Sequence, residues 1–348
     1  MLEHGGRLLE AARRHGIEPA LWLDLSTGIN PHAYPVGAIN ADAWRRLPEA
    51  EDGLVDIARR YYGVGDSLAE HMAIVPIAGT QAAIQALPRA VVRTRPTGQP
   101  LRVSVATLTY NEYAHAWTRA GHAVTAHDFS RLPEAAAHSD IVMLCQPNNP
   151  TGERLAQDAL HTMLTALRSH QGLAVVDEAY MDATPEGSLL RSLRAADWEH
   201  MIVLRSVGKF FGLAGARAGF ALGPPAIMQA LNEELGPWAL SGPTRAAVAQ
   251  ALNDAPWQHN TRASLQAMAS KLDAILQHRL HVNPTGTTLF RWFEHPRSAA
   301  LYAHLAGTAI LVRQFAAPTT GGQPSLRFGI PANDQQLARL DAALETFK

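Results

Sequence analysis

Short apolar runs alternate with helical patterns through the middle of the chain. Ile141–Cys145 is apolar throughout, and Leu173–Asp177 is apolar until it ends in an acid. Runs without polar alternation are typical of strands that are buried on both faces. Helical patterns separate them, at residues 110–120 and 153–170. Strands that alternate with helices in this way indicate crossover units and a mostly parallel sheet. The expected strands are 72–77, 101–106, 122–127, Ile141–Cys145, Leu173–Asp177 and Met201–Ser206.

The last third of the chain has a different pattern. A long helical stretch covers residues 256–280, and a closing helix is expected at 333–347. Between them we expect strands at 287–293, 310–315 and 326–330, separated by helices. This arrangement predicts an α/β protein in which a large domain, residues 41–254, is joined to a smaller α+β domain. Residues 1–40, as an N-terminal arm, and 255–348 would form the smaller domain.

Composition excludes several classes of function. The chain has 348 residues and a formal net charge of −1, with no basic patch for nucleic acid or an anionic membrane. No apolar run approaches the length of a membrane span, and the N-terminus lacks a signal-peptide core. A single cysteine, Cys145, excludes an intrachain disulfide, and we expect a cytoplasmic protein. The 16 histidines show no metal-binding spacing, so we expect no metal.

Polar residues follow several of the expected strands directly. They are Thr109-Tyr110, the NNPTG run at 148–152, the DEAY run at 177–180, and residues 206–209. Ligands of α/β sheets bind at such strand ends. Asp177 could ligate a metal, cap a helix or pair with a cationic ring nitrogen. Lys209 lies in a glycine-rich apolar segment, which suits a reactive amine better than a solvated one.

These motifs, in this order, resemble the fold-type I aminotransferases, in the branch of histidinol-phosphate aminotransferase. The motifs are NNPTG, DEAY and SxGKxxGLAGxRxG, and the resemblance covers nearly the whole chain. It implies pyridoxal 5'-phosphate (PLP) as cofactor, with Lys209 holding it as a Schiff base and later moving the proton at the substrate carbons. Asp177 would keep the ring nitrogen protonated. Asn149 and Tyr180 would bond the phenolic oxygen, and Tyr110 would stack on the ring.

The same resemblance implies a phosphate-binding region. Gly79, Thr80 and Gln81 begin an alanine-rich helical pattern after an expected strand. A helix N-terminus offers free backbone amides to an anion, and glycine allows close approach. Ser206 and Arg217 match the family's side-chain ligands of the cofactor phosphate.

Other residues resemble substrate ligands. Arg327 matches the arginine that binds the substrate carboxylate in this family. The HGG…DxSxxINP pattern near the N-terminus is similar to the threonine-phosphate decarboxylases of cobalamin biosynthesis. On that basis His4, Gly5, Asn30 and Arg313 are expected near the substrate, with Asn149 beside them. The resemblance implies decarboxylation of L-threonine O-3-phosphate, a phosphorylated amino acid, to (R)-1-amino-2-propanol phosphate.

Two other functions stay open, and the first of them shares every cofactor residue with the decarboxylase. One is an aminotransferase that acts on histidinol phosphate or a related amino acid. The other is a non-catalytic PLP-binding sensor, which usually carries a DNA-binding module ahead of this fold, and we expect none here. A homodimer is expected. Leu47 stands where many relatives have a tyrosine that reaches the neighbour's cofactor phosphate, so that contact is not expected in this chain.

Overall fold

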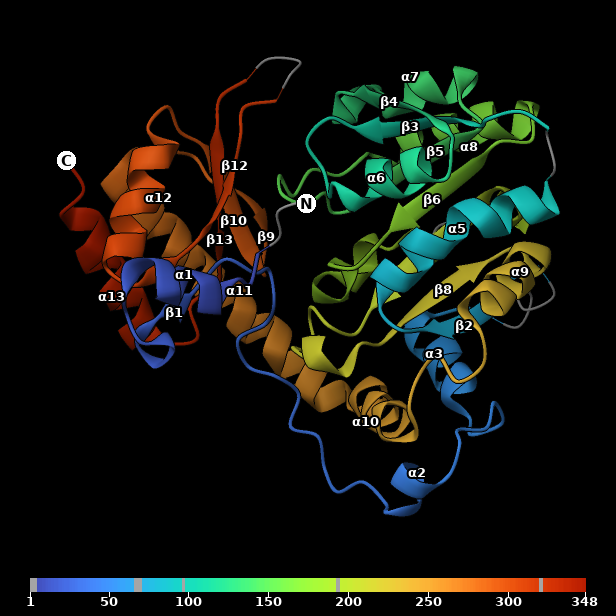
Figure 1. Ribbon diagram of the computed structural model, residues 1–348, viewed down its shortest axis with the longest axis horizontal. Helices are drawn as coiled ribbons and strands as arrows, with labels where there is room; N and C mark the ends of the chain where they lie inside the picture. Colours follow the sequence, from blue (N-terminus) through green and yellow to red (C-terminus); the bar gives the residue numbers. More distant parts are fainter. Residues whose placement is uncertain (1–4, 66–70, 96–97, 192–194, 319–321) are drawn as a thin grey trace.

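The computed structural model describes residues 5–65, 71–95, 98–191, 195–318 and 322–348. The larger of the two bodies in Figure 1 is built around a seven-stranded sheet with the order β2-β8-β7-β6-β5-β3-β4. The strands from β3 to β7 run parallel, whereas β8 is antiparallel to both of its neighbours. The mostly parallel sheet that the sequence predicts is therefore confirmed. Its strands are β2 Ala73–Ile77, β3 Arg102–Ala106, β4 Ala123–His127, β5 Ile141–Cys145, β6 Leu173–Asp177, β7 Met201–Ser206 and β8 Gly219–Gly223.

The core of this body lies along the central strands. Every residue of β5, β6 and β7 is buried, as their apolar runs predict, whereas β4 is an edge strand with exposed residues. Helices pack on the sheet, with α5 contacting α6 and α9, and α8 contacting α7 and β6. The helices of this body are α2 Asp42–Arg45, α3 Leu54–Tyr62, α5 Thr80–Thr94, α6 Glu112–Arg119, α7 Leu132–Ala135, α8 Gln157–Ser169, α9 Pro225–Leu235 and α10 Gly242–Asn253.

Strand β8 is not among the expected strands. Its sequence, GFALG, has glycine at both ends, and glycine weakens the strand pattern. Tertiary packing requires one of these glycines, because a Cβ on Gly219 would lie 2.4 Å from the backbone oxygen of Arg205. Strand β8 therefore depends on its close packing against β7, and no local sequence pattern predicts it.

The smaller body contains a four-stranded sheet with the order β12-β13-β10-β9 and the parallel pair β1–β11. Two of the expected strands are wrong, because neither forms one continuous strand in the structure. Residues 287–293 form a hairpin, because Thr287 turns the chain by accepting a hydrogen bond from the backbone N–H of Leu289 (3.1 Å). Residues 310–315 divide because β11 pairs with β1 while β12 pairs with β13. The strands are β1 Leu23–Asp24, β9 Thr285–Thr287, β10 Phe290–Glu294, β11 Ile310–Leu311, β12 Arg313–Phe315 and β13 Ser325–Gly329.

The N-terminal and C-terminal segments pack together on the smaller body. Figure 1 shows α1 and β1 beside the C-terminal helices, and β1 pairs with β11. The side chain of Asp254 caps α11 by accepting from the N–H of Trp257 (3.0 Å), next to the boundary expected at residue 254. The division into domains stays a prediction. The helices are α1 Leu8–His15, α11 Ala255–Leu280, α12 Ser298–Gly307 and α13 Asp334–Glu345.

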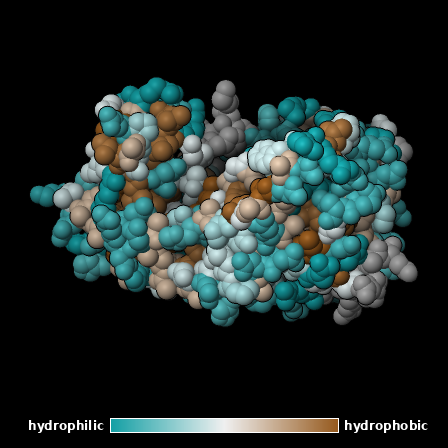
Figure 2. All heavy atoms as spheres, turned by 90° about the horizontal axis from the view of Figure 1, so that it is seen from below, coloured by the Kyte–Doolittle hydropathy of each residue, from teal (hydrophilic) through white to brown (hydrophobic). Residues whose placement is uncertain are grey.

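Several large apolar side chains lie at the surface. Trp44 and Leu47, in and just after α2, and Trp238 are more than half exposed. Helix α2 protrudes from the lower side of Figure 1, and Figure 2 shows hydrophobic residues among hydrophilic ones in the view from that side. Within the described residues, no helix combines the length and apolar character that crossing a membrane requires. Short 3-10 helices complete the connections: η1 Pro19–Leu21, η2 Phe129–Arg131, η3 Ala136–His138, η4 Met181–Ala183, η5 Pro185–Gly187, η6 Leu189–Arg191, η7 Ala195–His200 and η8 Ala214–Ala216.

Candidate active site

Lys209 lies at the carboxyl edge of the large sheet, three residues after β7. The adjacent strands β5 and β6 end at Cys145 and Asp177, and the three strand ends surround one cavity. The chain has three lysines, of which Lys271 is exposed and pairs with Asp334 and Lys348 is the last residue. Lys209 is therefore the lysine of this cavity. The other lining residues are Gly79, Thr80, Gln81, Tyr110, Tyr113, Asn149, Ala179, Tyr180, Ser206, Gly208, Ala214, Arg217 and Ala218.

Asp177 supplies a buried carboxylate to this cavity. Its Oδ2 accepts a hydrogen bond from the hydroxyl of Tyr113 (2.9 Å), and its Oδ1 accepts one from the N–H of Ala179 (2.9 Å). Burial raises the pKa of Asp177 to about 6, against the lowering effect of these two hydrogen bonds and of Lys209. An additional cation beside this carboxylate would favour its charged form.

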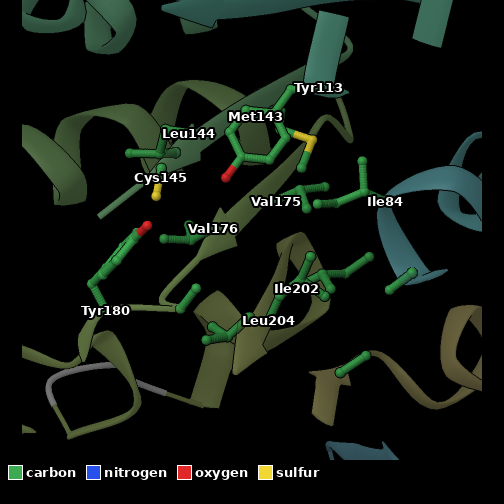
Figure 3. Packing of buried hydrophobic residues seen from close by; sticks show 14 of the residues in the cluster. Ile84, Tyr113, Met143, Leu144, Cys145, Val175, Val176, Tyr180, Ile202 and Leu204 are labelled. Atoms are coloured by element: carbon green, nitrogen blue, oxygen red, sulfur yellow. The ribbon is translucent and has the colours of Figure 1, made fainter. Parts of the chain in front are cut away.

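Aromatic side chains form part of the cavity wall. Figure 3 shows the hydroxyl groups of Tyr113 and Tyr180 pointing toward Cys145 from different sides. The ring of Tyr110 meets that of Tyr113 edge-on at 5.4 Å, and Nζ of Lys209 lies 5.4 Å from the centre of the Tyr180 ring. An amine, a buried carboxylate and aromatic faces together suit a flat cationic ring that carries a carbonyl group.

Gly79, Thr80, Ser206 and Arg217 gather at the N-terminus of α5. Gly79 has φ of 77°, and a Cβ there would lie 2.8 Å from Nη2 of Arg217. Glycine at this position therefore lets the guanidinium lie against the first turn of the helix, where backbone N–H groups favour an anion. The side chain of Gln81 is already bonded, since it accepts from the hydroxyl of Tyr110 (2.9 Å) and donates to Glu112 (2.8 Å).

A second cavity adjoins the first on the side of the smaller sheet. It shares Lys209, Tyr180 and Asn149 with the first cavity and adds Arg313 and Arg327. Arg327 is buried; it donates through Nη1 to Oδ1 of Asn149 and through Nη2 to the backbone oxygen of Ser26 (2.8 Å). Its buried Nε has no hydrogen-bond partner among the described residues. A buried guanidinium with an unused N–H is suited to an anionic ligand.

The N-terminal segment reaches this second cavity at Gly5. A Cβ on Gly5 would lie 2.4 Å from the backbone oxygen of Ser26, and the N–H of Gly6 donates to the hydroxyl of Ser26 (2.8 Å). His4, which the sequence places near the substrate, lies outside the described residues. Asn30 is buried behind the cavity wall, where its side chain donates to the backbone oxygen of Phe210 (2.8 Å). The structure thus brings Gly5 to the other site residues but not the Asn30 side chain.

The sequence profile of the aminotransferase class I and II family matches residues 44–344. The chain belongs to this family. A threonine-phosphate decarboxylase of Pseudomonas aeruginosa is 46% identical over 348 residues, which span 100% of this chain and 98% of the relative. A threonine-phosphate decarboxylase of Sinorhizobium sp is 37% identical over 354 residues, which span 98% of each chain.

Solved structures of this family share its fold. A histidinol-phosphate aminotransferase from Sinorhizobium meliloti in complex with pyridoxal-5'-phosphate superposes with a TM-score of 0.76 at 21% identity. The match covers 99% of this chain and 94% of the other. The fold-type I architecture expected from the motifs is therefore confirmed.

Tyr113, Gly28 and Phe315 belong to this aminotransferase-family site but are absent from the sequence interpretation. Tyr113 follows Tyr110 by three positions in the helical pattern, and this spacing alone would have suggested that both face the same side. Gly28 and Phe315 reach the second cavity because the N-terminal segment and β12 pack there. Neither has a local signal, since only the tertiary arrangement brings them to Lys209. Among the residues that the structure describes, no group of three or more His, Cys, Asp or Glu side chains is placed to hold a metal ion.

Proposed function

We propose that the chain is a PLP-dependent enzyme that decarboxylates L-threonine O-3-phosphate to (R)-1-amino-2-propanol phosphate for cobalamin biosynthesis. The observation that carries the proposal is the pair Arg313 and Arg327, which both line the cavity that Lys209 shares. Two guanidinium groups match a substrate with two anionic ends, a carboxylate and a phosphate. The two threonine-phosphate decarboxylases, at 46% and 37% identity over nearly their whole lengths, support the same substrate.

The residues around Lys209 fit PLP at each of its functional groups. Asp177 would pair with the ring nitrogen, and Asn149 and Tyr180 would bond the phenolic oxygen. The phosphate would bind at the N-terminus of α5, beside Ser206 and Arg217. When bound, PLP draws electrons from the bond that breaks at the substrate's Cα.

The protein's own groups then have distinct tasks. Asp177 stays ionised beside a cationic ring nitrogen, because an opposite charge favours the carboxylate over the protonated form. Arg327 binds the substrate carboxylate and Arg313 binds the phosphate, so that the two arginines fix the orientation of Cα. Lys209 delivers a proton to Cα after CO2 has left. The orientation that the arginines impose decides which bond at Cα breaks.

The decisive experiment supplies threonine phosphate to the purified PLP-loaded enzyme with and without 2-oxoglutarate. We expect CO2 release that does not require the keto acid. Glutamate formed from 2-oxoglutarate without CO2 would instead establish an aminotransferase, with histidinol phosphate as the next substrate to test. Lys209→Ala should lose both the near-visible absorbance band of protein-bound PLP and CO2 release. Lys271→Ala, at the exposed lysine, should keep both.

We further propose a homodimer that works in the cytoplasm. The exposed side chains of Trp44, Leu47 and Trp238 support an interface, because burying them against a second copy would remove apolar surface from water. Leu47 cannot donate a hydrogen bond to a neighbour's cofactor. Leu47→Tyr should therefore strengthen PLP binding by about 1 kcal/mol in the dimer. The absence of any second cysteine beside Cys145 supports a reducing compartment.

A further inference from the structure

We propose that Asn30 is a positioning residue for Lys209, and that it acts by holding the backbone of the loop that carries the lysine. Asn30 is 3% exposed. Its N–H donates to the backbone oxygen of Lys209 (3.0 Å), and its side-chain Nδ2 donates to the backbone oxygen of Phe210 (2.8 Å). Its Oδ1 accepts from the N–H of His32 (2.9 Å). The backbone N–H and the side-chain amide of one buried residue therefore join two consecutive carbonyl groups of the lysine loop to the N-terminal segment.

The contact continues along both backbones. The N–H of Tyr34 donates to the oxygen of Phe211 (2.8 Å). Gly212 has φ of 67°, and a Cβ there would lie 2.7 Å from Cα of Ala33. Residues 30–34 thus lie backbone to backbone against residues 209–212, and any shift of one segment moves the other.

The other end of the same N-terminal segment is bound to the substrate arginine. The N–H of Gly329, in β13, donates to the oxygen of Leu25 (2.7 Å), and Nη2 of Arg327 donates to the oxygen of Ser26 (2.8 Å). Residues 25–34 therefore connect the guanidinium that would bind the carboxylate with the amine that would protonate Cα. Because chemistry depends on that spacing to within about 1 Å, this segment is placed to control it.

The rest of the lysine loop is held independently of Asn30. The guanidinium of Arg262, in α11, lies 4.9 Å from the centre of the Phe210 ring, and the Trp257 ring meets Phe210 at 5.6 Å. These contacts fix the side chain of Phe210, whereas Asn30 bonds its backbone oxygen. Loss of the Asn30 amide should consequently shift the loop without unfolding it.

The test compares two substitutions of Asn30 with a matched control. Asn30→Asp keeps the size and the acceptor for His32 but, when ionised, cannot donate to Phe210. Asn30→Ala loses both side-chain contacts, and both variants keep the backbone bond to Lys209. Asn40 makes the same local contact, accepting from the N–H of Asp42 (2.9 Å), but lies exposed and far from the loop in sequence. Asn40→Ala is therefore the control. Three quantities are measured: kcat and KM for CO2 release, and the pH midpoint of the bound-PLP absorbance band.

Both Asn30 variants should lower kcat by up to about 10²-fold, as expected for a displaced catalytic group. KM should stay within about threefold, because the arginines that bind substrate are unchanged. The absorbance midpoint should shift by about half a pH unit, since the surroundings of Lys209 change. Asn40→Ala should match the wild type in all three.

Two results would overturn the proposal. A raised KM with unchanged kcat would make Asn30 a direct substrate ligand instead. An unchanged absorbance midpoint in Asn30→Ala, or in the isosteric Asn30→Asp should Asn30→Ala fail to fold, would show that Asn30 does not position Lys209. The kinetic part rests on the proposed function, but the absorbance titration does not. If the wild type releases no CO2, the proposed function fails while the titration still decides the role of Asn30.

Discussion

Arg313 and Arg327 lie directly opposite each other on the antiparallel strands β12 and β13. Like charges in this relationship destabilise a sheet when nothing lies between them. Both residues also line the cavity that contains Lys209. A ligand that carries negative charge would offset the repulsion between these two guanidinium groups.

Substitution of each arginine should show which end of the substrate that arginine binds. We expect Arg313→Met and Arg327→Met each to lower kcat/KM for threonine phosphate by about 30- to 1000-fold, because each loses a charge-assisted contact worth about 2–4 kcal/mol. When the substrate is unphosphorylated L-threonine, Arg313→Met should change kcat/KM little. Arg327→Met should lower kcat/KM by the same factor as with threonine phosphate. Steady-state CO2 release measures both. An equal loss on the two substrates in Arg313→Met would contradict the division of roles.

Asp177→Asn should lower the affinity for PLP and raise the stability of the cofactor-free protein. Burial raises the pKa of Asp177 from 3.8 to about 6, so the folded protein binds this proton more tightly than the unfolded chain does. The group therefore has no effect below about pH 4, where it is protonated in both states, and destabilises the fold most above pH 6. We expect the cofactor-free variant to gain about 1–3 kcal/mol in free energy of unfolding at pH 8.

Urea denaturation of cofactor-free Asp177→Asn and wild type at pH 8 and near pH 4 measures this difference. The gain should vanish at the lower pH. PLP affinity should fall by about 10- to 100-fold at pH 8, because an amide gives the ring nitrogen no negative charge. A variant whose gain in stability is the same at both pH values would show that the buried charge is not its cause.

Arg205 should be essential for stability. It lies in β7 and pairs with both Glu178 and Asp182, and all three side chains are buried. Arg205→Met leaves two carboxylates without their cation, so we expect the free energy of unfolding to fall by about 3–5 kcal/mol. Arg102→Met removes an exposed pair with Asp140 and should cost about 0–1 kcal/mol. Chemical denaturation compares the two, and similar losses would argue against a special role for burial.

Gly28→Ala should disturb Tyr180. A Cβ on Gly28 would lie 2.9 Å from Cε1 of Tyr180 and 3.0 Å from Cδ1 of Phe290. Because those two rings already pack edge-on at 5.0 Å, we expect a loss of about 1–3 kcal/mol in stability and a clear fall in kcat. Gly307→Ala, in α12, would meet no atom of the described part of the chain within 4 Å and should be neutral or slightly stabilising. Thermal unfolding and CO2 release check both variants. Wild-type activity in Gly28→Ala would mean that Tyr180 tolerates displacement.

Much of the large sheet was predictable because its strands are locally unambiguous. The apolar runs that form β5, β6 and β7 are buried on both faces. Such strands have no alternating polar residues and stand out in the sequence as short apolar runs. Strand β8 was not predictable, since Gly219 is required by the approach of Arg205 from a different strand. The strands of the smaller sheet were located, but the turn at residues 288–289 has no glycine or asparagine to mark it.

The sequence by itself determined the cluster of chemical groups at the ends of the parallel strands. Asp177 and Lys209 follow buried strands directly, and parallel strands bring such residues to one edge whatever the details of packing. Only the tertiary structure decided how the N-terminal segment takes part. Asn30 reads as a substrate ligand in the sequence, yet its amide bonds Phe210. Contacts between segments about 180 residues apart depend on how the two bodies pack, and no local pattern encodes that packing.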